Sequence, residues 1–155
     1  MARFIFSLFL WASTSLFAQN ELPLASTEIN NFLHSFDVAW NTHNTKALMS
    51  LWSTQGDFMT PQGRWIMNPT QLEKHFESGK LGFYGKSTIS QSLDAARLLN
   101  LELVIVDSTV RLNKGDKNDP LNSVLQHAVY ILIKNKEQWK ILSLRMYQFQ
   151  PQSVE

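Results

Sequence analysis

The sequence contains no cysteine in its 155 residues. Disulfide bonds and thiol chemistry are therefore excluded, and the fold must be stable on packing alone. Charge is also sparse, since charged residues make up 17% of the chain, with 14 basic and 13 acidic residues. Because the charges are nearly balanced and no basic run is present, the sequence indicates no binding site for nucleic acid or an anionic membrane surface. Apolar residues reach 44%, which is ordinary for one globular domain with a real core.

Residues 1–18 differ sharply from the rest of the chain. One basic residue, Arg3, precedes a short apolar run, and the small residue Ala18 comes just before polar residues. This order is typical of a secretory signal, and hydroxyl residues interrupt the run well before the roughly 20 apolar residues that a membrane anchor needs. We therefore expect cleavage after Ala18 and an exported protein, periplasmic or secreted, with no membrane attachment after cleavage. A short polar lead (residues 19–26) and a single domain (residues 27–150) follow.

Three helices are predicted in the first half of the chain. Apolar residues at helical spacing indicate the first helix, with Ser26 or Thr27 as its N-cap. A polar corner then leads to a short second helix, which Asn44 or Thr45 is placed to cap. The third helix starts at Pro69, where the missing N–H is not needed. The expected helices cover residues 27–40, 45–52 and 69–78.

The second half of the chain changes to the spacing of β-strands. A first hairpin turns at residues 61–63, and the short loops that follow make the later strands antiparallel neighbours. The fold class is therefore α+β, with N-terminal helices packed on a strongly curved antiparallel or mixed sheet. Both faces of residues 123–133 are apolar, so we expect a second copy of the chain to cover the outer face, giving a homodimer. The four long strands are predicted at residues 87–99, 101–112, 123–134 and 138–149.

The order of these elements, together with four short motifs, resembles the nuclear-transport-factor-two-like cone fold. More narrowly, the chain is similar to SnoaL-like proteins of the SgcJ/EcaC type that carry a secretion signal. The resemblance covers about residues 27–148 and implies a conical pocket between the concave sheet and the first helices. Because this fold hosts isomerases, lyases, hydrolases, dimerisation modules and ligand binders, it does not assign a reaction. The motifs are Ala39-Trp40-Asn41-Thr42-His43-Asn44, Gly56-Asp57-Phe58, Gly63-Arg64-Trp65 and Trp139-Lys140-Ile141.

The ketosteroid isomerases of this superfamily give a position-by-position test. There an acid just before the hairpin turn takes the proton, and a first-helix Tyr with a protonated Asp on a late strand stabilises the enolate. The corresponding positions here are Thr60 and Phe36, and residues 123–134 contain no acid. The resemblance therefore does not carry isomerase activity to this chain.

Four residues are candidates for chemistry: His127, Arg145, Tyr147 and Asp57. Alternation places His127 with Leu125, Val129 and Ile131, either as a satisfied histidine or as a base. It also places Arg145 in phase with Trp139, Ile141, Ser143 and Tyr147. If that face is concave, Arg145 needs an anionic ligand or an internal acid such as Asp94, Glu102 or Asp107. Asp57, next to the hairpin, is favoured in a structural role as an acceptor of hydrogen bonds.

A ligand pocket is the leading functional hypothesis. Trp40 and Trp65 can wall it, whereas Trp52 and Trp139 are assigned to the core. The four histidines are scattered without ligand spacing, so neither a metal nor a cofactor is expected. The sequence thus predicts a binder of a small hydrophobic or aromatic molecule, anionic if Arg145 faces the cavity. The alternatives are a SnoaL-like isomerase, lyase or hydrolase, and a dimerisation module with a filled cone. The predicted pocket residues are Trp40, Phe58, Thr60, Trp65, His127, Arg145 and Tyr147.

Overall fold

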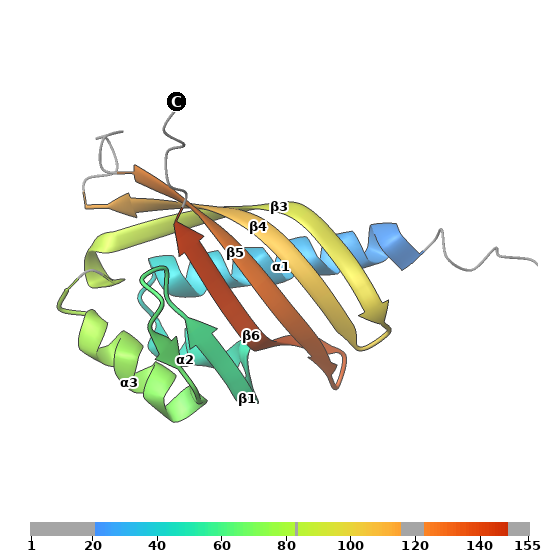
Figure 1. Cartoon of the computed structure of the whole chain (residues 1–155), viewed down its shortest axis with the longest axis horizontal. Helices are drawn as coiled ribbons and strands as arrows, with labels where there is room; N and C mark the ends of the chain where they lie inside the picture. Colours follow the sequence, from blue (N-terminus) through green and yellow to red (C-terminus); the bar gives the residue numbers. More distant parts are fainter. Residues whose placement is uncertain (1–20, 83, 116–122, 149–155) are drawn as a thin grey trace, which may run out of the picture.

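The structure, a computed structural model, describes residues 21–82, 84–115 and 123–148. It is an α+β fold in which helices pack on one face of a curved, open sheet (Figure 1). The predicted signal, residues 1–18, lies outside the described residues. The helices are α1 (Glu21–Asn41), α2 (Thr45–Ser50), α3 (Pro69–Gly79) and the 3-10 turn η1 (Tyr84–Lys86). The strands are β1 (Trp52–Met59), β2 (Trp65–Ile66), β3 (Ser87–Asn100), β4 (Leu103–Lys114), β5 (Ser123–Asn135) and β6 (Gln138–Gln148).

The six strands form one mixed sheet in the order β2-β1-β6-β5-β4-β3. All neighbours are antiparallel except β1 and β6, which run parallel and are separated along the chain by the helix α3 and four strands. The long α1 lies across the concave face behind β3 to β6, and α2 and α3 lie at the β1 side (Figure 1). The predicted fold class, with helices on a strongly curved mixed sheet, is therefore confirmed.

Two helix starts test the capping predictions. Asn44 is the N-cap of α2 and accepts a hydrogen bond from the Ala47 N–H at 3.0 Å, as expected. The first helix, in contrast, begins at Glu21, so the prediction that Ser26 or Thr27 caps it is wrong. The residues before Ser26 continue the helix because Pro23 falls in its first turn, where proline is tolerated.

Side chains of α1 pair with the edge strand β3. The Asn41 carboxamide accepts from the Ile89 N–H at 2.7 Å and donates to the Ile89 carbonyl at 2.9 Å. One turn earlier, Asp37 accepts from the Gln91 N–H at 2.9 Å. An open sheet edge otherwise leaves such groups unpaired, so these contacts fix α1 against β3 and close one side of the concave space.

A bulge in β6 reverses the direction of its side chains. Ile131 pairs with Ser143, whereas the next residue, Leu132, pairs with Ile141, so one residue of β6 has no partner. Trp139 and Ile141 therefore point to the concave face before the bulge, and Leu144 and Met146 do so after it. The prediction that Arg145 is in phase with Trp139 and Ile141 is wrong, because strict alternation does not survive the extra residue.

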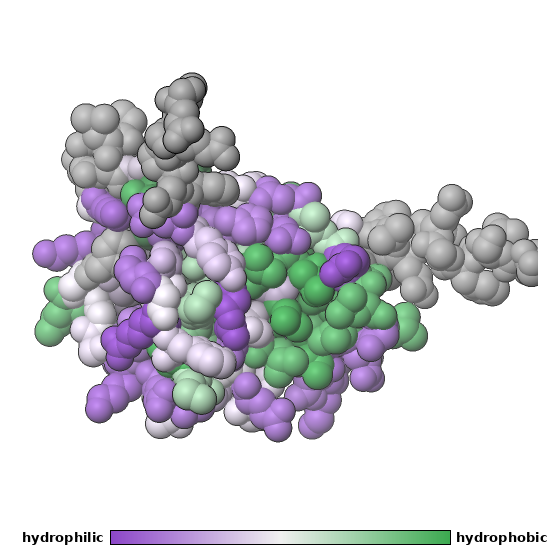
Figure 2. Space-filling view, viewed as in Figure 1, coloured by the Kyte–Doolittle hydropathy of each residue, from purple (hydrophilic) through white to green (hydrophobic). Residues whose placement is uncertain are grey.

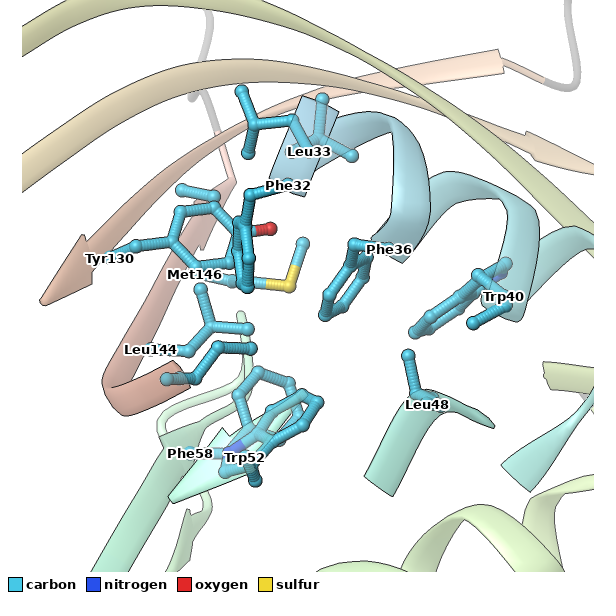
Figure 3. Packing of buried hydrophobic residues seen from close by; sticks show 14 of the residues in the cluster. Phe32, Leu33, Phe36, Trp40, Leu48, Trp52, Phe58, Tyr130, Leu144 and Met146 are labelled. Atoms are coloured by element: carbon cyan, nitrogen blue, oxygen red, sulfur yellow. The ribbon is translucent and has the colours of Figure 1, made fainter. Parts of the chain in front are cut away.

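The core is aromatic at its centre. Trp52 and Trp139 are 6% and 8% exposed, which confirms their assignment to the core. Phe36 lies 5.8 Å from Trp52 and 5.9 Å from Tyr130 between ring centroids, so one α1 side chain contacts both β1 and β5 of the sheet. Figure 3 shows this packing. Within residues 21–82, 84–115 and 123–148, no helix combines the length and apolar character needed to cross a membrane.

Candidate functional site

A cavity of about 420 Å³ opens between α1, α3 and the concave sheet face. Its walls are mainly aromatic and aliphatic, and each comes from a different element: Phe36 and Trp40 from α1, Phe76 from α3, Val110 from β4 and Met146 from β6. Figure 3 shows four of the lining side chains, Phe36, Trp40, Tyr130 and Met146, packed beside one another. Such a shape suits a ligand of mainly apolar character.

Trp40 is held rigidly at one wall of the cavity. Its ring lies 6.2 Å from Phe36 and 5.8 Å from Phe76, and its indole N–H donates to the Ser87 hydroxyl at 3.2 Å. The α1 helix ends at Asn41, directly after Trp40. Just beyond it, His43 has a positive φ of 52°, and its N–H donates to the Trp40 carbonyl at 2.9 Å. The end of the helix fixes the backbone of Trp40, and the ring contacts with the Ser87 hydrogen bond fix its indole. Trp40 lines the cavity, as the sequence predicted.

Phe58 and Thr60, at the end of β1, also line the cavity as predicted. The Phe58 ring is stacked on Phe76 at 6.3 Å, and Thr60 stabilises the hairpin turn through two hydrogen bonds with the backbone of Arg64. Thr60 donates its N–H to the Arg64 carbonyl at 2.9 Å, and its hydroxyl accepts from the Arg64 N–H at 3.2 Å. The hydroxyl at this position is thus part of the turn that shapes the cavity mouth.

The end of the cavity at Tyr130, here called its deep end, carries a polar network in which Tyr130 is buried and Gln91 and Asp37 are partly buried. The Tyr130 hydroxyl donates to the Gln91 side-chain oxygen at 2.7 Å, and the Gln91 side-chain nitrogen donates to Asp37 at 3.0 Å. Burial raises the pKa of Tyr130 far above its usual range, and hydrogen bonding to Gln91 only partly opposes this. Burial also raises the pKa of Asp37. Sequence reasoning missed Gln91 and Tyr130, because their roles depend on contacts between residues far apart in the chain.

His75 of α3 is the titratable imidazole at the cavity. Burial, with a smaller contribution from the positive charge of Arg64, lowers the pKa of His75, so its ring is neutral at pH 7. Its ring packs against Phe58 at 6.4 Å and Phe76 at 5.5 Å between centroids. The apolar side of the third helix, on which His75 falls in the sequence, was the available signal for this residue.

Arg145 is paired on the convex face. It forms a bidentate salt bridge with Asp57, with N–O distances of 2.8 and 2.9 Å. The prediction that Asp94, Glu102 or Asp107 is its internal partner is therefore wrong. The Trp65 indole N–H donates to the same carboxylate at 2.9 Å, and the Arg145 guanidinium lies 5.5 Å from the Trp65 ring. Asp57 therefore accepts hydrogen bonds from Trp65 of the hairpin and from Arg145 of β6, which agrees with its expected structural role.

His127 and Tyr147 also lie on the convex face, on adjacent positions of β5 and β6. The His127 ring is 3.2 Å from an Asp107 carboxylate oxygen and 4.0 Å from Asp94, and it is partly exposed. Tyr147 is 47% exposed. The sheet thus separates the four candidates for chemistry, and also the 58% exposed Trp65, from the cavity that Trp40, Phe58 and Thr60 line. Among the described residues, no group of three or more His, Asp or Glu could hold a metal ion.

No protein-family model matches the chain, and no curated protein matches its sequence. Solved structures are similar in fold. A domain of unknown function with a cystatin-like fold from Nostoc punctiforme superposes with a TM-score of 0.72 at 16% identity, covering 82% of this chain and 78% of that one. An NTF-2-like protein of unknown function from Shewanella oneidensis gives a TM-score of 0.68 at 13% identity, covering 80% and 99%.

A ketosteroid isomerase-like protein from Erwinia carotovora atroseptica gives a TM-score of 0.65 at 12% identity, covering 81% of this chain and 96% of that one. At such identities the likeness concerns the fold alone. The chain has the cystatin-like, nuclear-transport-factor-two-like cone fold that the sequence motifs predicted.

Proposed function

We propose that this cone-fold chain binds a small, largely apolar or aromatic organic molecule in the cavity between α1, α3 and the sheet. The observation that carries the proposal is a cavity of about 420 Å³ with aromatic walls and a few polar groups at its ends. Ligand sites of this kind occupy about 300–1,000 Å³. A filled cone leaves no such space, so the cavity also argues against a module that serves dimerisation alone.

A second candidate function is an enzyme of the isomerase, lyase or hydrolase type. The observation that favours it is His75, whose neutral imidazole lines the cavity beside the rings of Phe58 and Phe76. An imidazole in this state can accept a proton from a bound molecule. Chemistry in this cavity would start from His75 rather than from His127, Arg145, Tyr147 or Asp57, which lie beyond the sheet.

Filling the cavity tests the binding proposal. Val110, which is 1% exposed, lines the cavity from β4, and Val110→Phe places a phenyl ring in the space. We expect this variant to bind 2-naphthol at least about tenfold more weakly than the wild-type chain in calorimetric titrations. The matched control is Val129→Phe, on the convex face of β5, which should leave the affinity unchanged. Equal weakening by both variants, or no binding of 2-naphthol to the wild type, contradicts the proposal.

We also propose that two copies of the chain associate through the convex face of the sheet. An apolar patch there lies on β4 and β5, where Ile133 pairs with Leu103 and Ile131 with Ile105, and it consists of Leu103, Ile105, Val129, Ile131 and Ile133. Figure 2 shows apolar residues gathered on this face, over the ends of β3 to β5. An exposed apolar patch on a sheet face is typical of an interface. Export of the chain stays a prediction from residues 1–18.

A charge at the centre of the patch tests the dimer. The wild-type chain should give a dimer mass in native mass spectrometry, and Ile131→Glu should give a monomer mass, because the dimer would bury two unpaired carboxylates. The control Thr70→Glu, on the exposed first turn of α3, should stay dimeric. A monomeric wild-type chain contradicts the proposal.

A further inference from the structure

Gln91 links three side chains at the deep end of the cavity. Its side-chain oxygen accepts hydrogen bonds from the Tyr130 hydroxyl at 2.7 Å and the Ser108 hydroxyl at 3.1 Å. Its side-chain nitrogen donates to Asp37 Oδ1 at 3.0 Å. The three partners come from β5, β4 and α1, so the amide is held from three sides.

The direction of every hydrogen bond in this network is determined by its chemistry. Asp37 already accepts the Gln91 backbone N–H through Oδ2 at 2.9 Å, and a carboxylate can only accept. The Gln91 side-chain nitrogen must therefore face Asp37, and its oxygen must face the two hydroxyls. Both hydroxyls then donate to that oxygen, and they occupy its two lone pairs.

Tyr130 consequently presents the cavity with an acceptor and not with a donor. Its side chain lines the cavity, and in Figure 3 its hydroxyl points away from β5 toward α1. The proton of that hydroxyl is bound to Gln91, which leaves an oxygen lone pair for a ligand. The Asp37 carboxylate behind Gln91 adds negative potential at the same end.

We propose that the deep end of the cavity selects a neutral ligand that carries a hydroxyl or N–H group at its inner end and rejects one that carries only acceptors there. This inference rests on the proposed ligand-binding function. A ligand carbonyl or carboxylate at this position would meet the Tyr130 oxygen and lose a hydrogen bond to water without replacement. The ligand class is thus a phenol, an alcohol or an N–H heterocycle with an apolar aromatic body.

The test compares 2-naphthol with 2-methoxynaphthalene, which keeps the ring and the oxygen but lacks the donor. In calorimetric titrations of the wild-type chain, we expect 2-naphthol to bind about tenfold more tightly. Equal binding of the two probes, or tighter binding of the ether, overturns the inference while leaving the proposed function intact. Binding of neither probe overturns the proposed function and this inference with it.

Two variants then assign the preference to the network. Gln91→Met keeps the length of the side chain but frees the Tyr130 and Ser108 hydroxyls to donate, so the affinity ratio of the two probes should fall from about ten to about one. A purely structural role of Gln91 would weaken both probes equally and leave the ratio unchanged. Gln126→Met removes the other buried amide of the cavity and should keep the ratio. If the ratio persists in Gln91→Met, or collapses only in Gln126→Met, the inference is wrong.

Discussion

Replacement of Gly56 by alanine is expected to lower the free energy of unfolding by about 3 kcal/mol, near the upper end of the usual range for overpacking. A Cβ at this position would lie 2.5 Å from Cδ1 of Trp52 and 2.6 Å from the carbonyl oxygen of Ile141. The second atom belongs to the backbone of β6, so it cannot move aside as a flexible side chain would. β1 and β6 would have to separate beside Trp52, which is in the core.

The measurement is urea denaturation followed by tryptophan fluorescence, with Gly82→Ala as the control. A Cβ on Gly82 would meet its nearest atom at 3.7 Å, which is ordinary contact, so this variant should change the free energy of unfolding by less than about 0.5 kcal/mol. If Gly56→Ala is as stable as Gly82→Ala, the close approach of β1 to β6 is wrong.

The sequence predicted the elements well because each carries a strong local signal. The β5 strand, predicted at residues 123–134 and observed at Ser123–Asn135, is an apolar run rich in β-branched residues, and polar residues flank it in the sequence. The short α2 was predicted from Asn44, whose side chain is a local acceptor for the helix N-terminus. Signals of this kind need only neighbouring residues.

One error came from a place where the local regularity of a strand fails. The bulge in β6 is set by how the strand meets β5, and nothing in the residues 138–148 announces it. One extra residue then puts Arg145 and Tyr147 on the convex face, although they were predicted to be in phase with Trp139 and Ile141, which point to the concave face. The same shift brings Arg145 to Asp57, 88 residues away in the chain.

The candidate site was predicted only in part, because some of its residues carry a local signal and others do not. Trp40 was predicted as an aromatic wall, and Phe58 and Thr60 were predicted to share one face of their strand; all three line the cavity. The network of Gln91 and Tyr130 was not, because 39 residues separate the two and neither belongs to a recognisable motif. A glutamine on a strand predicts nothing by itself. Its function here depends on Asp37, which a helix in another part of the chain supplies.

Removal of the Asp57 carboxylate should also lower the free energy of unfolding strongly. Asp57→Ala leaves the Arg145 guanidinium without either of its hydrogen bonds at 2.8 and 2.9 Å, and it removes the acceptor of the Trp65 indole. The side chains of Arg145 and Asp57 are 26% and 18% exposed, so the pair is neither fully buried nor fully solvated. We expect a loss of about 2 kcal/mol at pH 7, below the 3–5 kcal/mol of fully buried pairs because water screens this one.

The pH dependence of this loss identifies its cause. Burial acts to raise the pKa of Asp57, but hydrogen bonds from Arg145, Trp65 and Ser143 outweigh it and lower the pKa below that of an unfolded chain, about 3.9. A carboxyl with a lowered folded pKa stabilises the fold above about pH 4, and this contribution disappears as the pH falls through the folded pKa. The difference between wild type and Asp57→Ala in urea denaturation should thus be constant from pH 7 to about pH 5 and should shrink toward pH 3.

The exposed ion pair of Glu77 and Lys80 provides the matched control for this experiment. Its two charges are 2.8 Å apart, the same distance as in the Asp57–Arg145 pair, but both side chains are well exposed. Glu77→Ala should therefore leave the urea midpoint unchanged at pH 7. A difference for Asp57→Ala that stays constant down to pH 3 would mean that lost packing against Trp65, and not the ionised carboxylate, makes this residue stabilising. The Asp57 carboxylate binds both Arg145 and Trp65 on the convex face of the sheet. The stability that it provides therefore comes from a residue that does not line the proposed ligand cavity.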